Sequence, residues 1–218
     1  MHRRQVVAIA CNVYRFMEHQ DSGLHVLGLR LPTDPRWVNL AEMDLEEILT
    51  DHAYCEQKAA ISCISLIQGY PDKTELVREL APIVTEEWGH FRLVLAEMDK
   101  RGLQLGRQRK DEYVNELLKF QQKGGTRETA LLERLLTFAL IEARSCERFR
   151  LLSLHINDEH LKTFYHKFMV AEAGHYRLFL DLSKLYYGAE ATRKRWQEYL
   201  VHEARIMDTL EVRGDRIH

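Results

Sequence analysis

Proline and glycine are scarce in this sequence of 218 residues, which contains only 4 prolines and 11 glycines. Because these residues interrupt helices and strands, their scarcity predicts long elements and argues against a β-sandwich with many turns. The 4 cysteines form no Cys-x-x-Cys pair, which excludes a zinc knuckle or a rubredoxin-like iron site made from closely spaced pairs. Cysteines used in this way suit a reducing cytoplasm, which is the location that we expect.

A membrane segment and a strong net charge are also missing. No apolar run approaches the ~20 residues that a membrane-spanning helix needs. The short run from Val6 to Ala10 falls below the ~7–15 residues of a secretion signal, so residues 1–33 are expected to form an N-terminal arm. The balance of 31 Lys+Arg against 33 Asp+Glu excludes a general electrostatic grip on nucleic acid, although a local basic patch remains possible.

The rest of the chain is predicted to be all-α, in a single domain with a bundle over residues 44–188. Pro32 and Pro35 turn the chain before the bundle, and Asp44 begins the first long helix as a capping residue. Pro82 is expected to kink or restart the second helix. Beyond residue 210, the tail is expected to be loose. The spacing predicts helices over residues 44–69, 72–102, 111–122, 126–156, 157–188 and 190–210.

Four of these helices carry apolar seams with alternating steps of four and three residues, the pattern of helices that pack at a shallow angle. Polar side chains interrupt each seam near its middle. They are Glu56, Glu87, His90, Glu142, Glu172 and His175. Buried carboxylates cost several kcal/mol each unless they are compensated, and two divalent or trivalent cations would compensate them. Because residues at i and i+3 share a helix face, the glutamate and histidine of one helix can bind the same ion.

The spacing of these residues indicates a duplicated helix pair around a dinuclear metal site. Glu56 and Glu87 are 31 residues apart, and Glu142 and Glu172 are 30 residues apart. A hydrogen-bond network without metal is disfavoured, because four inward carboxylates outnumber two imidazoles. Ligands rich in carboxylate favour iron over manganese or zinc.

Two glutamates compete for the ligand position on the third long helix. Glu142 and Glu147 are five residues apart, so they point about 140° away from each other. Glu142 continues the apolar seam, which makes it the predicted ligand. Glu147 is expected to form an outer-face salt bridge with Arg144 or to lie behind the ligands.

Weaker candidates flank the predicted metal site. His52 and Tyr165 lie in the seams, where each fits either a pocket position or ordinary core packing. Arg107, Arg109 and Lys110 form a basic connection, which is usually a solvated loop. In a protein with a nucleic-acid substrate, this connection is the first place to test for binding.

Longer phrases carry a resemblance to a known family. They are LGLRLPTDPRWVNLAE, DHAYCEQKAA, EEWGHFRLVL, IEARSCERFRLL and AEAGHYRLFL. Over roughly residues 27–210, the chain resembles the ferritin-like di-iron proteins that hydroxylate methylthio-isopentenyl-adenosine in tRNA. The resemblance implies a ferritin-like four-helix bundle with additional helices, two iron ions held by the six residues named above, and dioxygen as co-substrate. It further implies hydroxylation of the isopentenyl group beside the anticodon, a tRNA substrate and an external electron-donor reductase.

Other classes remain open. A manganese catalase-like protein or another ferritin-like oxidoreductase shares this core, and a helical adaptor without activity is a further alternative. A rubrerythrin would usually bring Cys-x-x-Cys pairs, which are absent. A ribonucleotide reductase small subunit would place a radical tyrosine where this chain has Val94. We expect a cytoplasmic monomer or small homo-oligomer that does not bind membranes.

Overall fold

The computed structural model describes residues 26–218, so most of the expected N-terminal arm, residues 1–25, lies outside the described residues. Within residues 26–218, the secondary structure is entirely helical, as the sequence predicts. A 3-10 turn, η1 (Val26–Gly28), precedes the α-helices. These are α2 (Trp37–Glu42), α3 (Leu45–Gly69), α4 (Thr74–Lys100), α5 (Glu112–Phe120), α6 (Arg127–His155), α7 (Glu159–Tyr187) and α8 (Ala189–Thr209). None of these helices combines the length and the apolar character needed to cross a bilayer.

Side-chain caps explain where four of the helices begin. Asp44 accepts a hydrogen bond from the backbone N–H of Glu47 at 3.1 Å, and Asp111, Thr126 and Asp158 cap α5, α6 and α7 in the same way. Each cap satisfies a backbone donor that the first helical turn leaves unpaired. The starts predicted at Asp44, Thr126 and Asp158 are therefore confirmed.

One local expectation is wrong, and one of the two alternatives for Pro82 is excluded. The segment after Pro35 forms the short helix α2, which the sequence reading treated as a turn, and Trp37 anchors it by donating from Nε1 to the carbonyl of Arg213 at 2.8 Å. Helix α4 continues through Pro82 as one element, so the chain does not restart there. A proline costs an internal hydrogen bond, but the rest of this 27-residue helix remains continuous.

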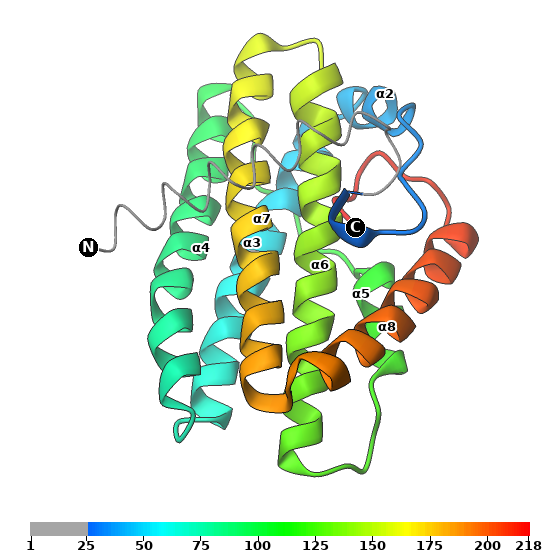
Figure 1. The fold of residues 1–218 in the computed structure, drawn as a ribbon. Coiled ribbons are helices and arrows are strands. Elements are labelled where there is room, and N and C mark those ends of the chain that lie inside the picture. Colours follow the sequence, from blue (N-terminus) through cyan, green and yellow to red (C-terminus); the bar gives the residue numbers. More distant parts are fainter. Residues whose placement is uncertain (1–25) are drawn as a thin grey trace. The chain divides into compact units, whose positions relative to one another are not determined.

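The described chain divides into two compact units. The α3–α4 unit comprises residues 35–110 and 212–217, and the α6–α7 unit comprises residues 26–34, 111–211 and 218. Each unit is built on two long antiparallel helices that lie side by side, because only a short connection joins them (Figure 1). Apolar side chains of the predicted seams fill both units: Leu49, Leu66 and Leu80 are fully buried in the first, and Leu135 and Leu161 in the second.

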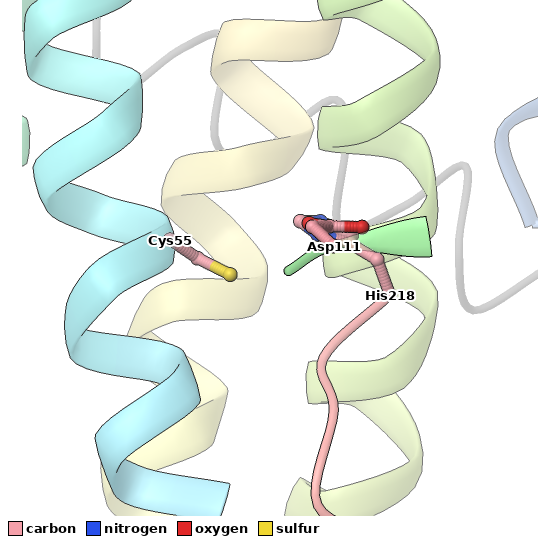
Figure 2. Close-up of side chains that lie close together, drawn as sticks. All are labelled: Cys55, Asp111 and His218. Atoms are coloured by element: carbon pink, nitrogen blue, oxygen red, sulfur yellow. The ribbon is translucent and has the colours of Figure 1, made fainter. Parts of the chain in front are cut away.

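The C-terminal tail is held by hydrogen bonds, so the expectation of a loose tail is wrong. In the α3–α4 unit, the backbone N–H of Ile217 donates to Asp51 at 2.8 Å. In the α6–α7 unit, the imidazole of His218 lies beside the carboxylate of Asp111 at 3.2 Å (Figure 2). Its other ring nitrogen is 2.8 Å from the hydroxyl of Ser145. Buried polar contacts of this kind fix the end of the chain.

Candidate metal centre

The α3–α4 unit contains a cluster of two carboxylates and one imidazole, which we call the first triad. Its members are Glu56 from α3 and Glu87 and His90 from α4. One ligand atom of each lies within 4.8 Å of the others. The Nδ1 atom of His90 is 3.3 Å from Oε2 of Glu87 and 3.4 Å from Oε2 of Glu56. Two ligand atoms that each lie about 2.0–2.2 Å from one cation are roughly 3.0–3.5 Å from each other, so the spacing of this donor set fits a metal ion.

His52 orients the first triad from one turn away on α3. Its Nε2 atom is 2.7 Å from Oε1 of Glu56, and the imidazole is completely buried. Because one carboxylate oxygen of Glu56 is held by His52, the other is left to face His90. An imidazole that holds a ligating carboxylate helps to fix the geometry of a metal site. His52 therefore lies directly behind a candidate ligand.

The α6–α7 unit contains the second triad, which repeats the composition of the first. Glu142 comes from α6, and Glu172 and His175 come from α7. One ligand atom of each again lies within 4.8 Å of the others, and Nδ1 of His175 is 3.2 Å from Oε2 of Glu172. All three side chains are buried, where carboxylates need a compensating charge. The structure thus brings the six predicted residues together as two triads, each complete within its own unit.

Two further candidates on the helices of the second triad, Tyr165 and Cys146, are buried. Tyr165 is fully buried, and its ring stacks on Phe149 with centroids 5.7 Å apart, so it takes part in core packing. The thiol of Cys146 donates to the carbonyl of Met169 at 3.3 Å. Burial raises the pKa of this thiol, and the negative charge of Glu172 raises it further. Cys146 therefore stays protonated and acts as a small core residue.

Glu147 lies in a buried ion network away from the second triad. Its carboxylate accepts hydrogen bonds from the backbone and hydroxyl of Thr33, both at 2.7 Å, and from Arg144 at 2.8 Å. The predicted pairing with Arg144 is therefore present, but its expected position on the outer face is wrong because both side chains are buried. Thr33 covers them, and no local pattern predicts this contact, which spans 114 residues.

The same network reaches α5 and α8 through residues that sequence reasoning missed. Arg144 donates to Glu203 on α8 through Nε at 3.0 Å and through Nη2. Tyr113 donates to Glu203 at 3.4 Å. Burial raises the pKa of Glu203, and the positive charge of Arg144 opposes this shift. Burial also raises the pKa of Tyr113, so the phenol remains protonated and donates. This network ties α5 and α8 to the helix that carries Glu142.

The three basic residues of the connection between α4 and α5 differ in their contacts. Arg109 is half-buried and donates to Glu47 and to Asp215, the latter at 2.9 Å, so its charge is used inside the α3–α4 unit. Burial lowers the pKa of Arg109, and the nearby charge of Arg216 adds to the effect. Arg107 and Lys110 are exposed, and no partner is found for either within residues 26–218.

The fold and the donor sets define a class: this is an all-α, ferritin-like protein, as the sequence predicted, with carboxylate–histidine triads suited to metal. More particularly, the chain belongs to the tRNA-(MS[2]IO[6]A)-hydroxylase (MiaE) family, whose model matches residues 24–218.

Individual relatives agree with this assignment. A tRNA 2-(methylsulfanyl)-N(6)-isopentenyladenosine(37) hydroxylase of Pseudomonas putida is 37% identical over 78% of this chain and 81% of its own length. A protein of the same name from Salmonella typhimurium is 28% identical over 72% of this chain and 75% of its own. Among solved structures, Protein 43 with aldehyde deformylating oxygenase activity from Synechococcus is similar, with a TM-score of 0.80 and 32% identity. That likeness covers 86% of this chain and 93% of the Synechococcus protein.

Proposed function

We propose that this protein is an oxygen-dependent tRNA hydroxylase. Its substrate would be the isopentenyl group of (methylthio-)isopentenyl-adenosine beside the anticodon, and its co-substrate dioxygen. Membership of the tRNA-(MS[2]IO[6]A)-hydroxylase family supports this assignment. The observation that carries the chemistry is the pair of Glu–Glu–His triads, one in each unit.

In this proposal, the two triads together ligate two iron ions. Glu56, Glu87 and His90 supply one set of ligands, and the second triad supplies the other. Hard carboxylate oxygens combined with imidazole suit iron, which supports it over zinc. When bound, iron supplies the dioxygen activation and the electron transfer that protein side chains cannot provide.

The protein's own residues would bind, orient and shield. His52 holds Oε1 of Glu56 at 2.7 Å, which limits rotation of this ligand. In the α6–α7 unit, Phe149, Phe168 and Phe179 are buried and lie four or seven residues from a ligand of the second triad, so their rings would help to keep water from it. Excluding water protects a reactive site from side reactions and strengthens the electrostatic interactions within it.

Two partners follow from the chemistry. The oxidation consumes two external electrons per turnover, and no flavin or iron–sulfur motif is visible in the sequence, so a separate reductase would supply them. The tRNA substrate would place the enzyme in the cytoplasm.

The test is direct hydroxylation of a defined RNA. Iron-loaded protein is incubated with a reductant, dioxygen and an anticodon stem-loop carrying isopentenyl-adenosine, with and without the methylthio group. We expect mass analysis of the nucleosides to show the gain of one oxygen atom on the isopentenyl group. Glu172→Ala is the matched control, because it removes one ligand of the second triad and should abolish the gain. An iron-loaded protein that leaves both RNAs unchanged would refute the proposal.

A further inference from the structure

The exposed tryptophan of α4 stands out beside the first triad. The chain contains 3 tryptophans. Trp37 is fully buried and Trp196 is 7% exposed, whereas Trp88 is 47% exposed. Trp88 lies between the ligands Glu87 and His90 in the sequence. A large aromatic side chain exposed beside a functional site is more typical of a binding surface than of a core.

The duplicated motif provides an internal comparison. The first repeat reads Glu-Trp-Gly-His and the second reads Glu-Ala-Gly-His. The position equivalent to Trp88 is Ala173, which is 1% exposed. Because both repeats carry the same kinds of ligand, the metal site does not require the indole. The exposed tryptophan belongs to one repeat only, so its role is separate from ligation.

Phe91 and Arg92 complete the surface around Trp88. The ring of Phe91 packs against the indole with centroids 5.0 Å apart and so supports it. Arg92 is exposed one helical turn after Trp88, and residues four apart share a helix face. The guanidinium of Arg92 has no hydrogen-bond or ion-pair partner within the part of the chain that the structure describes. By contrast, Arg78 on the same helix and Arg101 directly after it pair with glutamates.

The backbone next to Trp88 carries no side chain at Gly89. Gly89 lies in the interior of α4, and a Cβ added there would meet no other heavy atom within 4 Å. Glycine costs about 0.5–1 kcal/mol in a helix interior relative to alanine, and it is often explained by close packing. No such packing is present at Gly89 or at the equivalent Gly174, so both repeats leave this space open and only the first places an exposed tryptophan beside it.

We propose that Trp88 and Arg92 form a docking surface for an unpaired nucleotide of RNA. The indole stacks on the base, and the guanidinium binds the adjacent phosphate. Base–aromatic stacking is a major source of affinity for unpaired nucleotides, and arginine matches phosphate geometry. Protein recognition of RNA concentrates on loops whose bases are unstacked, and the anticodon region is such a loop. This inference rests on the proposed function, because tRNA is the RNA concerned.

Intrinsic fluorescence can test the stacking step, since Trp88 is the tryptophan that solvent reaches. We expect an anticodon stem-loop carrying the modified adenosine to quench the fluorescence and to protect Trp88 from acrylamide. The Trp88→Phe variant should lose the fluorescence change while keeping most of the affinity, because phenylalanine still stacks. Trp88→Ala should weaken RNA binding roughly 5- to 150-fold.

The phosphate contact has its own signature. Arg92→Gln should weaken RNA binding and reduce the slope of log affinity against log salt by about one phosphate contact. Arg92→Lys should retain that slope, because the charge is preserved. Leu93→Ala is the matched control, since Leu93 is 54% exposed on the same helix and points about 140° away from Trp88. It should bind RNA like the unmodified protein.

Activity separates this proposal from the proposed function. Trp88→Ala should raise KM for the stem-loop and keep its iron, whereas the control Leu93→Ala should keep both the KM and the iron content of the original protein. If the original protein hydroxylates the stem-loop but Trp88→Ala and Arg92→Gln bind it normally, the docking surface is wrong while the function stands. If the original protein neither binds nor modifies the RNA, the function fails and this surface loses its ligand. A self-associating protein that Trp88→Ala converts to monomers would assign the surface to a second copy of the chain and overturn the proposal.

Discussion

Replacing Arg144 by methionine should destabilise the protein severely. The guanidinium is completely buried and donates to Glu147, Glu203, Thr33 and the carbonyl of Leu31. Methionine matches much of the volume but removes every donor and the positive charge. Two buried carboxylates are then left without their cation.

The size of the stability loss depends on how many hydrogen-bond donors each carboxylate keeps in the variant. Glu147 retains two donors from Thr33, so part of its charge remains stabilised. Within residues 26–218, Glu203 retains only the 3.4 Å hydrogen bond from Tyr113, and burial already raises its pKa. Removing one partner of a buried ion pair costs about 3–5 kcal/mol. For a protein of this size, each kcal/mol shifts Tm by about 2–4 °C, so Tm should fall by about 6–20 °C.

Urea unfolding monitored by circular dichroism measures this loss. We expect the Arg144→Met, Glu203→Gln double variant to recover much of the stability, because the neutral amide needs no cation. The deficit of Arg144→Met should also shrink as the pH falls towards the ordinary pKa of a glutamate. Because burial raises the pKa of Glu203, this carboxyl takes up its proton before an exposed glutamate does, and the buried charge disappears. A loss below about 1 kcal/mol, or no recovery in the double variant, would refute the reasoning.

The remaining predictions concern the second triad and the C-terminal tail. Glu142→Ala should lose iron and activity, whereas Glu147→Ala should keep two irons but melt at a lower temperature; iron analysis of both purified variants decides, and the opposite pattern would overturn the seam assignment. For Asp215, burial alone would raise the pKa, but hydrogen bonds from Arg213 and Arg109 and the charge of Arg216 lower it from 3.8 to about 2. Its contribution to stability is therefore present above its ordinary pKa and lost as the pH falls towards 2. Asp215→Asn should be less stable than the original protein near neutral pH and nearly equal to it at the acid end, as urea midpoints across this range will show.

Much of the fold could be predicted from the sequence because its signals are local. Capping residues such as Asp44 and Thr126 act within three positions, and the apolar seams repeat along each helix. The residues of the two triads could be predicted for the same reason, because a glutamate in an otherwise apolar seam is visible in the sequence pattern. Helix α2 was missed because six residues give too short a window for a helical period to show.

The contacts that the sequence could not supply join residues far apart in the chain. Arg109 was a candidate for binding nucleic acid, but Asp215 takes up its charge from a position 106 residues later. The pairing of Arg144 with Glu203 spans 59 residues. No local pattern distinguishes such cations from free ones, as the exposed Arg92 illustrates. Deciding which charges are available for a partner therefore required the three-dimensional structure.

Helix α6 is buried around its whole circumference at the level of Glu142. Residues 142–149 are all buried, which is more than two full turns. Amide hydrogens in such a segment exchange with solvent only when the whole domain opens. Glu142 therefore lies in a part of the fold that is expected to open with the highest free energy, and release of an ion held there would require that opening. The residence time of an ion at Glu142 would thus depend on the stability of the surrounding core and not on Glu142 alone.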